Sequence, residues 1–219
     1  MKPDDRPTLL PILLWGALWG LAEATLGFAL HKAAVALPGL PGFLMFPVAA
    51  FFLERTFRTA GRASAALGAS AVAAVVKLTG LAVPGADPIR VLNPALSILF
   101  EGLAVAALFA VFARAGREPG LLGAFAAAVA WRGAFCLHLW LLAAFALPAG
   151  LVTSGAATLL RFLVGESLAN ALLIAVLFRA LRSLPERTAW TVPSTGQRRA
   201  AFAAAAAAFA AAVAAATLL

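Results

Sequence analysis

The sequence predicts an all-α fold: a polytopic transmembrane helix bundle with a six-helix core and an alanine-rich helix at the C-terminus. The first reason is composition, because 63% of the 219 residues are hydrophobic and 12% are charged, with a mean hydropathy of +0.98. Soluble domains are about 45–50% apolar and about 25% charged. The second reason is that seven apolar stretches approach the roughly 20 residues that cross a bilayer. The third is that charged residues lie inside those stretches, where each costs at least ~2.5 kcal/mol and is rarely kept without a use.

Short connections separate the candidate spans. The second span is short unless it begins in the turn at residues 38–42, and the seventh is nearly pure alanine, a good helix former that is only marginally lipophilic. We expect a six-helix transmembrane core over 1–182, a polar cytoplasmic linker over 183–199, and a transmembrane or packing helix over 200–219. The candidate spans cover about residues 8–30, 41–54, 63–83, 92–113, 120–147, 162–181 and 200–219.

The positive charges predict the orientation. If the N-terminus is cytoplasmic and every span crosses, twelve of the 17 Lys and Arg residues fall in inner loops, and only Lys32, Arg90 and Arg161 fall in outer loops. Cytoplasmic loops are enriched in Lys and Arg, so we expect a multi-pass protein of the bacterial inner (plasma) membrane with its N-terminus inside. The basic residues form no continuous stripe, so the expected partner is the lipid bilayer and not nucleic acid. No removable signal peptide is expected, since two acids precede the first span and no small-residue cleavage site follows it.

The first span carries a stripe of small and polar residues. Gly16, Gly20, Glu23, Gly27 and His31 lie within about 80° of one another on a helix. Glycine at this spacing permits another helix to approach closely, which would bury Glu23 in protein. The alternative interpretation is a packing seam that contains one hydrogen-bonded glutamate.

Polar residues recur at helical spacing in later spans. Asn93, Ser97 and Glu101 follow one another at steps of four residues in the fourth span. Glu166 and Asn170 repeat that step in the sixth. Each set therefore lies on one face of its helix.

With the N-terminus inside, the polar residues within the spans share the middle and outer half of the membrane, which predicts one cavity at that depth. Among the embedded charges, three acids face two bases, so one carboxylate is left that is either protonated or meets a cationic group of a ligand. A histidine in such a span is more typically hydrogen-bonded than a metal ligand. The candidate substrate-binding residues are Glu23, Lys77, Asn93, Ser97, Glu101, Arg132, His138, Glu166 and Asn170.

Signatures of membrane enzymes are absent from the sequence. It contains no His-Glu-x-x-His zinc helix and no Gly-x-Ser-x-Gly elbow. It also contains no Gly-x-x-x-x-Gly-Lys-Ser/Thr phosphate loop, so the chain cannot by itself power ATP-driven transport. His31 and His138 lie at different depths and make a poor haem pair. We therefore expect no enzyme activity, no cofactor and no metal.

Four stretches are similar to a set of bacterial integral membrane proteins: WGLAEATLGFALH at 19–31, PGFLMFP at 41–47, Lys77 in the third span, and NPALSILFEGL at 93–103. The organisation of the chain over about 8–181, with about six helices, polar residues in the outer half and Pro/Gly-rich outer loops, resembles the substrate-binding S components of energy-coupling factor (ECF) transporters. The resemblance implies capture of a vitamin or metal from outside and docking on a membrane coupling subunit driven by two ATPases. It also implies that Gly16, Ala17 and Gly20 pack on that coupling subunit.

Two features depart from the family. The chain begins MKPDD and not with the Met-His start of nickel and cobalt members, so a metal solute is not expected. The alanine-rich seventh span is additional to the usual six.

Three hypotheses follow. The first is a substrate-capture subunit for uptake of a small polar or amphoteric solute, with loops 31–40, 84–91 and 148–161 as lids over the cavity. The second is a stand-alone proton-coupled secondary transporter that uses a protonatable glutamate. The third is a structural or enzymatic subunit of a larger membrane complex.

Overall fold

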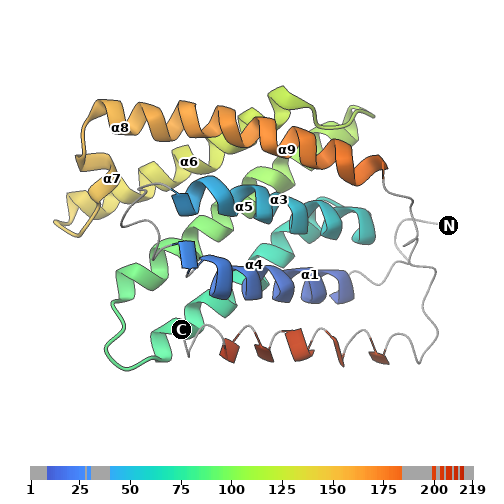
Figure 1. Cartoon of the computed structure of the whole chain (residues 1–219), viewed down its shortest axis with the longest axis horizontal. Coiled ribbons are helices and arrows are strands. Elements are labelled where there is room, and N and C mark those ends of the chain that lie inside the picture. Colours follow the sequence, from blue (N-terminus) through green and yellow to red (C-terminus); the bar gives the residue numbers. More distant parts are fainter. Residues whose placement is uncertain are drawn as a thin grey trace.

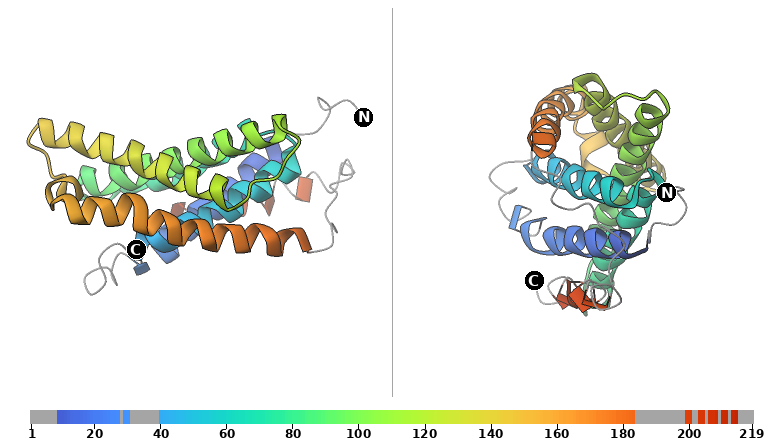
Figure 2. Two further views of the ribbon diagram at one scale, coloured as in Figure 1. Left: turned by 90° about the horizontal axis from the view of Figure 1, so that it is seen from above. Right: turned by 90° about the vertical axis from the view of Figure 1, so that its right-hand side faces the viewer.

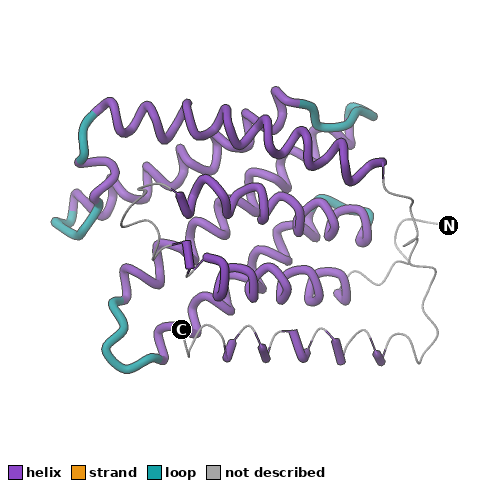
Figure 3. The backbone as a smooth tube through the Cα atoms, in the orientation of Figure 1, coloured by secondary structure: helices purple, strands orange, loops and turns teal. Residues whose placement is uncertain are grey.

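The computed structural model of the chain describes residues 9–27, 29–30, 40–183 and short pieces of 199–214. These residues form helices joined by short loops and turns, with no strand among them (Figure 3). Six helical segments are long and apolar enough to cross a membrane, so the chain is a multi-pass membrane protein by helix length and hydropathy. The predicted all-α bundle with a six-helix core is confirmed. The predicted linker and seventh helix lie mostly outside the described residues and stay predictions.

Several spans combine an α-helix with a turn of different pitch. The first is α1 (Leu9–Ala22) followed by a π-helical turn, η2 (Glu23–Gly27). The third is α4 (Ser64–Leu78) followed by a 3₁₀ turn, η3 (Thr79–Ala82). Three spans are single helices: α3 (Leu40–Ala60), α5 (Pro88–Arg114) and α6 (Leu121–Ala144).

The last span is the most interrupted. The short helix α7 (Gly150–Thr153) leads into a continuous helical run made of α8 (Ala156–Leu160), the π-helical turn η4 (Arg161–Gly165) and α9 (Glu166–Ser183). Figure 1 shows this run along one side of the bundle, with α7 at the same end as the start of α8.

Two helix boundaries differ from those predicted. α5 begins at Pro88 and not near residue 92, because the Asp87 carboxylate accepts a hydrogen bond of 3.0 Å from the Ile89 amide and caps the helix. Pro94, which is close to the predicted start of this span, therefore lies inside α5. α3 continues to Ala60, beyond the predicted residue 54, since Glu54 and Arg58 pair one turn apart and extend the helix.

The helices α1, α4, α5, α6, α9 and α3 follow one another around the bundle, each packed against the next (Figures 1 and 2). α3 also contacts α4 and α5 and so crosses the middle of the bundle. Its Phe46, Ala49, Ala50 and Leu53 are completely buried. α3 is therefore the helix on which both halves of the bundle pack.

Small residues let α4 approach its two neighbours closely. A Cβ atom added at Gly16 of α1 would lie 2.7 Å from the Ala69 carbonyl oxygen, and one at Gly20 would lie 2.9 Å from Val76. On the other side, a Cβ at Gly102 of α5 would collide with the Ser70 side chain. Close backbone approach of this kind is what drives helix association in lipid, where apolar surface alone provides little.

The two ends of the bundle differ in charge. Arginines gather where α3 and α5 end, where α4 begins and along the last turns of α9. The opposite end holds the 83–87 turn, α7 and α8. The described arginines at the first end include Arg55, Arg58, Arg62, Arg114, Arg117 and Arg179.

Candidate functional site

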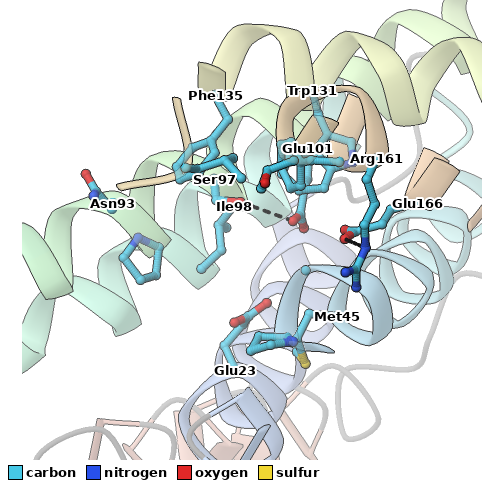
Figure 4. A pocket seen from close by; sticks show the side chains of 16 residues that line it. Glu23, Met45, Asn93, Ser97, Ile98, Glu101, Trp131, Phe135, Arg161 and Glu166 are labelled. Atoms are coloured by element: carbon cyan, nitrogen blue, oxygen red, sulfur yellow. Dashed lines mark hydrogen bonds and ion pairs between the residues drawn. The ribbon is translucent and has the colours of Figure 1, made fainter. Parts of the chain in front are cut away.

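A cavity of about 450 Å³ lies toward the arginine-poor end of the bundle, between η2, α3, α5, α6 and the α7–α9 run. Figure 4 shows that its polar side chains come from several helices and point into one space. Arg161 lines the cavity with a side chain that is 69% exposed, so the cavity reaches the protein surface at this point. The lining residues are Glu23, Pro41, Gly42, Met45, Asn93, Pro94, Ser97, Ile98, Glu101, Trp131, Phe135, Leu151, Thr158, Arg161, Phe162 and Glu166.

Three carboxylates line this cavity from three helical segments. Glu23 is 7% exposed and accepts a hydrogen bond of 3.2 Å from Trp19 Nε1. Glu101 is 3% exposed, and its Oε1 accepts a hydrogen bond of 3.3 Å from the Ser97 hydroxyl. Oε2 of Glu101 is buried without a hydrogen-bond partner among the described residues. A buried carboxylate oxygen in that state is costly, so it marks a position suited to a donor from a ligand.

Both π-helical turns flank the cavity. η2 begins at Glu23, and η4 ends immediately before Glu166. A π-turn inserts a residue into the helix and rotates the side chains that follow, and such turns are frequent at functional sites. η4 therefore sets the direction of Glu166, which follows it, whereas Glu23 is the first residue of η2.

Arg132 lies behind the cavity wall and is fully buried. Its Nη2 donates to Asn170 Oδ1 at 2.6 Å and to the Gly42 carbonyl at 3.4 Å, and it lies 3.8 Å from Glu166 Oε2. Its Nη1 donates to the Ser167 hydroxyl at 3.4 Å. Arg132 thus ties α6 to α9 and α3 and offsets the charge of Glu166, which a buried ion requires.

Asn170 completes this connection to α3. Pro47 lies inside α3 and has no backbone N–H, so the Phe43 carbonyl four residues earlier lacks its helical donor. Asn170 Nδ2 donates to that carbonyl at 2.6 Å. The side chain of α9 therefore replaces a hydrogen bond that the helix itself cannot make.

Two further polar residues act on the lining from outside it. His138 Nε2 shares a hydrogen bond of 3.0 Å with Asn93 Oδ1. Lys77 attracts Glu23 electrostatically from α4. Each therefore supports a residue that faces the cavity.

Aromatic side chains form much of the remaining wall. The Trp131 and Phe162 rings meet edge to face with centroids 5.9 Å apart, and Phe135 lies 6.4 Å from Trp131. The Arg132 guanidinium lies 4.6 Å from the Trp131 ring centroid, on the protein side of the wall. Trp131 is 2% exposed, and its Nε1 has no hydrogen-bond partner among the described residues.

The structure brings five of the predicted substrate-binding residues into the lining: Glu23, Asn93, Ser97, Glu101 and Glu166. The other four predicted residues are not among the lining residues, although the sequence predicts one cavity lined by the whole set: Lys77, Arg132, His138 and Asn170. They lie one layer further from the cavity, since each one contacts or attracts another polar residue of the site.

The residues predicted to pack on a coupling subunit have a partner within the chain. Gly16 and Gly20 lie against α4, and Ala17 is completely buried. Their predicted role toward another subunit stays a prediction. His31, the last residue of the predicted stripe, lies outside the described residues.

Sequence reasoning missed the aromatic wall. Trp131, Phe135 and Phe162 were not singled out as lining residues, because a bulky apolar side chain has the same pattern whether it faces a cavity, the core or lipid. The four-residue step from Trp131 to Phe135 was the available signal.

No cluster of three or more His, Cys, Asp or Glu side chains in the described part of the chain is arranged to hold a metal ion. Comparisons with protein-family models, curated proteins and solved structures found no match.

Proposed function

We propose that the protein is a membrane-embedded capture subunit for the uptake of a small polar or amphoteric solute, which binds in the cavity in the outer half of the bilayer. The observation that carries this proposal is a cavity of about 450 Å³ that contains a buried carboxylate oxygen with no partner among the described residues. Cavities of about 300–1,000 Å³ with apolar walls and a few convergent polar groups are typical of small-molecule sites.

The charge asymmetry of the bundle supports entry from outside. The cavity lies toward the end opposite the arginine cluster, and Lys and Arg are enriched on the cytoplasmic side of membrane proteins. Between the cavity and the arginine-rich end, inward-facing side chains from α3, α5, α6 and α9 form a tightly packed layer. Phe46, Leu53, Val105, Ala128 and Ala171 are each at most 1% exposed. This layer favours a site that is reached from one side.

The test is recovery of a bound solute. The full chain is purified gently from its native membranes, and released small molecules are identified by mass spectrometry. We expect one solute in near-stoichiometric amount with wild type and with Glu118→Gln, a carboxylate at the arginine-rich end, and its loss with Glu101→Gln. Equal recovery from Glu101→Gln, or no solute from wild type, contradicts the proposal.

The runner-up is a stand-alone proton-coupled transporter. Glu101 favours this second function as well. Among the described residues it forms no ion pair within 4 Å, and a buried carboxylate of this kind is suited to proton transfer. The chain alone, reconstituted in liposomes, distinguishes the two functions. A transporter accumulates the recovered solute when a proton gradient is applied, whereas a capture subunit binds it without accumulation and requires partner subunits such as a coupling protein and ATPases. Co-purification of other proteins without any solute would instead favour a subunit of a larger complex.

A further inference from the structure

The residues that line the cavity indicate which chemical class of solute it binds. Glu23 enters from η2 and Glu101 from α5, and both point into the same space (Figure 4). Neither forms an ion pair within 4 Å with a cationic side chain of the described residues. Two carboxylates that face a shared space repel each other unless a positive charge lies between them.

The positive charges near the site are either engaged by the chain or lie outside the lining. Lys77 attracts Glu23 from α4 but does not line the cavity. Arg132 is fully buried and donates to Asn170, Ser167 and the Gly42 carbonyl. Arg161 is the only cationic residue among the described residues of the lining, and its Nε lies 3.8 Å from Glu166 Oε1. Glu166 therefore has two arginine neighbours, while Glu101 has the Ser97 hydroxyl. An anionic solute would meet three carboxylates in this lining and one arginine that already lies beside Glu166.

The walls exclude a bare metal ion as the best occupant. Calcium takes six to eight oxygen ligands and magnesium six. The three carboxylates of the lining are not grouped to hold a metal ion together, and much of the remaining wall is apolar: Met45, Ile98, Trp131, Phe135 and Phe162. Apolar and aromatic side chains gain nothing from a hydrated ion, but they bury an organic body.

We infer that the solute is a small organic cation, with an ammonium group between Glu101 and Glu23 and an apolar or aromatic body against Trp131, Phe135 and Phe162. An ammonium group carries three N–H donors. It can donate to Glu101 Oε2 and to an oxygen of Glu23 at once, which satisfies the buried oxygen and supplies the counter-charge. This inference rests on the proposed function, since it names the class of solute for that same cavity.

The test uses three probes that share a phenyl body: 2-phenylethylamine, which is cationic at pH 7, neutral 2-phenylethanol, and anionic 3-phenylpropionate. Binding to the full chain in detergent is measured by titration calorimetry. Because the probes also partition into micelles, every titration is repeated with Glu101→Gln and with Glu118→Gln. Circular dichroism and gel filtration report folding of each variant, and Glu23→Gln replaces Glu101→Gln if the latter does not fold.

We expect the amine to bind wild type at least about tenfold more tightly than the alcohol or the acid. The cavity variant should lose this preference, with amine affinity reduced by about tenfold or more, while Glu118→Gln keeps wild-type affinity. Equal or tighter binding of the alcohol or the acid, no binding of any probe, or unchanged amine binding in the folded cavity variant overturns the inference.

Failure of this inference is distinguishable from failure of the proposed function. A neutral or anionic solute recovered from the purified protein would end the organic-cation assignment and leave solute capture intact. No recovered solute together with no probe binding would end both.

Discussion

Buried acids occur toward both ends of the bundle, but their charges are offset in different ways. Toward the arginine-rich end, Glu54 is 4% exposed and pairs with Arg58, one turn later on the same helix. At the cavity, Glu166 pairs with Arg132 from another helix, and Glu101 forms no ion pair within 4 Å among the described residues. A local pair can form as soon as its helix forms. The cavity acids instead depend on the assembled bundle and, in our proposal, on a ligand.

The cavities at the two ends differ in the same way. A second cavity of about 220 Å³ lies at the arginine-rich end, where Glu54 and Glu118 are accompanied by Arg58 and Arg117 in the lining. Acids and bases are thus balanced there, whereas the described lining of the larger cavity has three acids and one arginine. The lining itself therefore compensates charge at one end, while at the other end, in our proposal, a ligand completes the compensation.

The largest expected effect concerns which end faces outward. In a Cys136→Ala background, single cysteines are introduced on either side of α5, at Pro84 in the cavity-end turn and at Ala115 in the arginine-end turn. We expect a membrane-impermeant maleimide to label Pro84→Cys in intact cells and to label Ala115→Cys only after the cells are opened. The reverse pattern would place the cavity on the cytoplasmic side and contradict the proposed capture from outside.

The next largest effect tests whether Arg132 serves the fold or binds the solute directly. Arg132→Met removes the hydrogen-bond donor to Asn170. It also removes the buried cation that lies 3.8 Å from the buried Oε2 of Glu166. Removing one partner of a buried pair typically costs about 3–5 kcal/mol. We expect a loss of that size in the free energy of unfolding, measured by SDS titration in mixed micelles.

The matched control for Arg132 is Arg90, whose side chain is 88% exposed and lies 3.5 Å from Asp87 Oδ2. Arg90→Met should cost at most about 1 kcal/mol, as exposed pairs do. If Arg132→Met were as stable as Arg90→Met, the fold would not depend on Arg132, and a direct role in binding would become the better explanation.

A smaller effect is expected from the close contact between Gly102 of α5 and Ser70 of α4, next to Glu101. Gly102 follows Glu101 and lies against Ser70, so Gly102→Ala forces α5 away from α4. Overpacking of this kind costs about 1–3 kcal/mol. Adding Ser70→Gly removes the colliding atoms and should restore part of the loss. Gly133→Ala, where an added Cβ meets nothing within 4 Å, is the control and should not destabilise the protein.

The six spans could be predicted because hydropathy and helical period are local properties of the sequence. The role of Arg132 could not, because its partners Ser167, Asn170 and Gly42 lie 35, 38 and 90 residues away along the chain. Spacing along one helix reveals which side chains share a face, but not which helix that face meets.

Aromatic residues illustrate the same limit. Trp131 is 2% exposed and forms the cavity wall, whereas Trp140, nine residues later on the same helix, is 49% exposed on the outer surface. Both are large apolar residues in one transmembrane span, so the sequence does not separate them. The start of α5 differs from the prediction for another reason: the apolar run begins near residue 92, but the Asp87-Pro88 capping signal starts the helix one turn earlier.

The smallest expected effect distinguishes the two hydrogen bonds of the Asn170 side chain. Its Oδ1 accepts from Arg132, and its Nδ2 donates to the Phe43 carbonyl that Pro47 leaves without a helical donor. Pro47→Ala restores the backbone N–H, so the second hydrogen bond becomes redundant while the first remains. Asn170→Ala should therefore cost about 0.5–1.5 kcal/mol less in the Pro47→Ala background than in wild type.

A double-mutant cycle on the free energy of unfolding measures this difference, because the loss of the Arg132 contact is common to both backgrounds and cancels. Pro94 is the control, since it is also a proline inside a helix but lies on α5. The cycle of Asn170→Ala with Pro94→Ala should give no coupling. Equal coupling with both prolines would mean that proline removal stabilises the bundle generally, and that Asn170 does not act as the missing donor of α3. If the coupling is specific to Pro47, the wall behind the cavity depends on a bond between α9 and α3, just as the arginine-rich end depends on pairs within one helix.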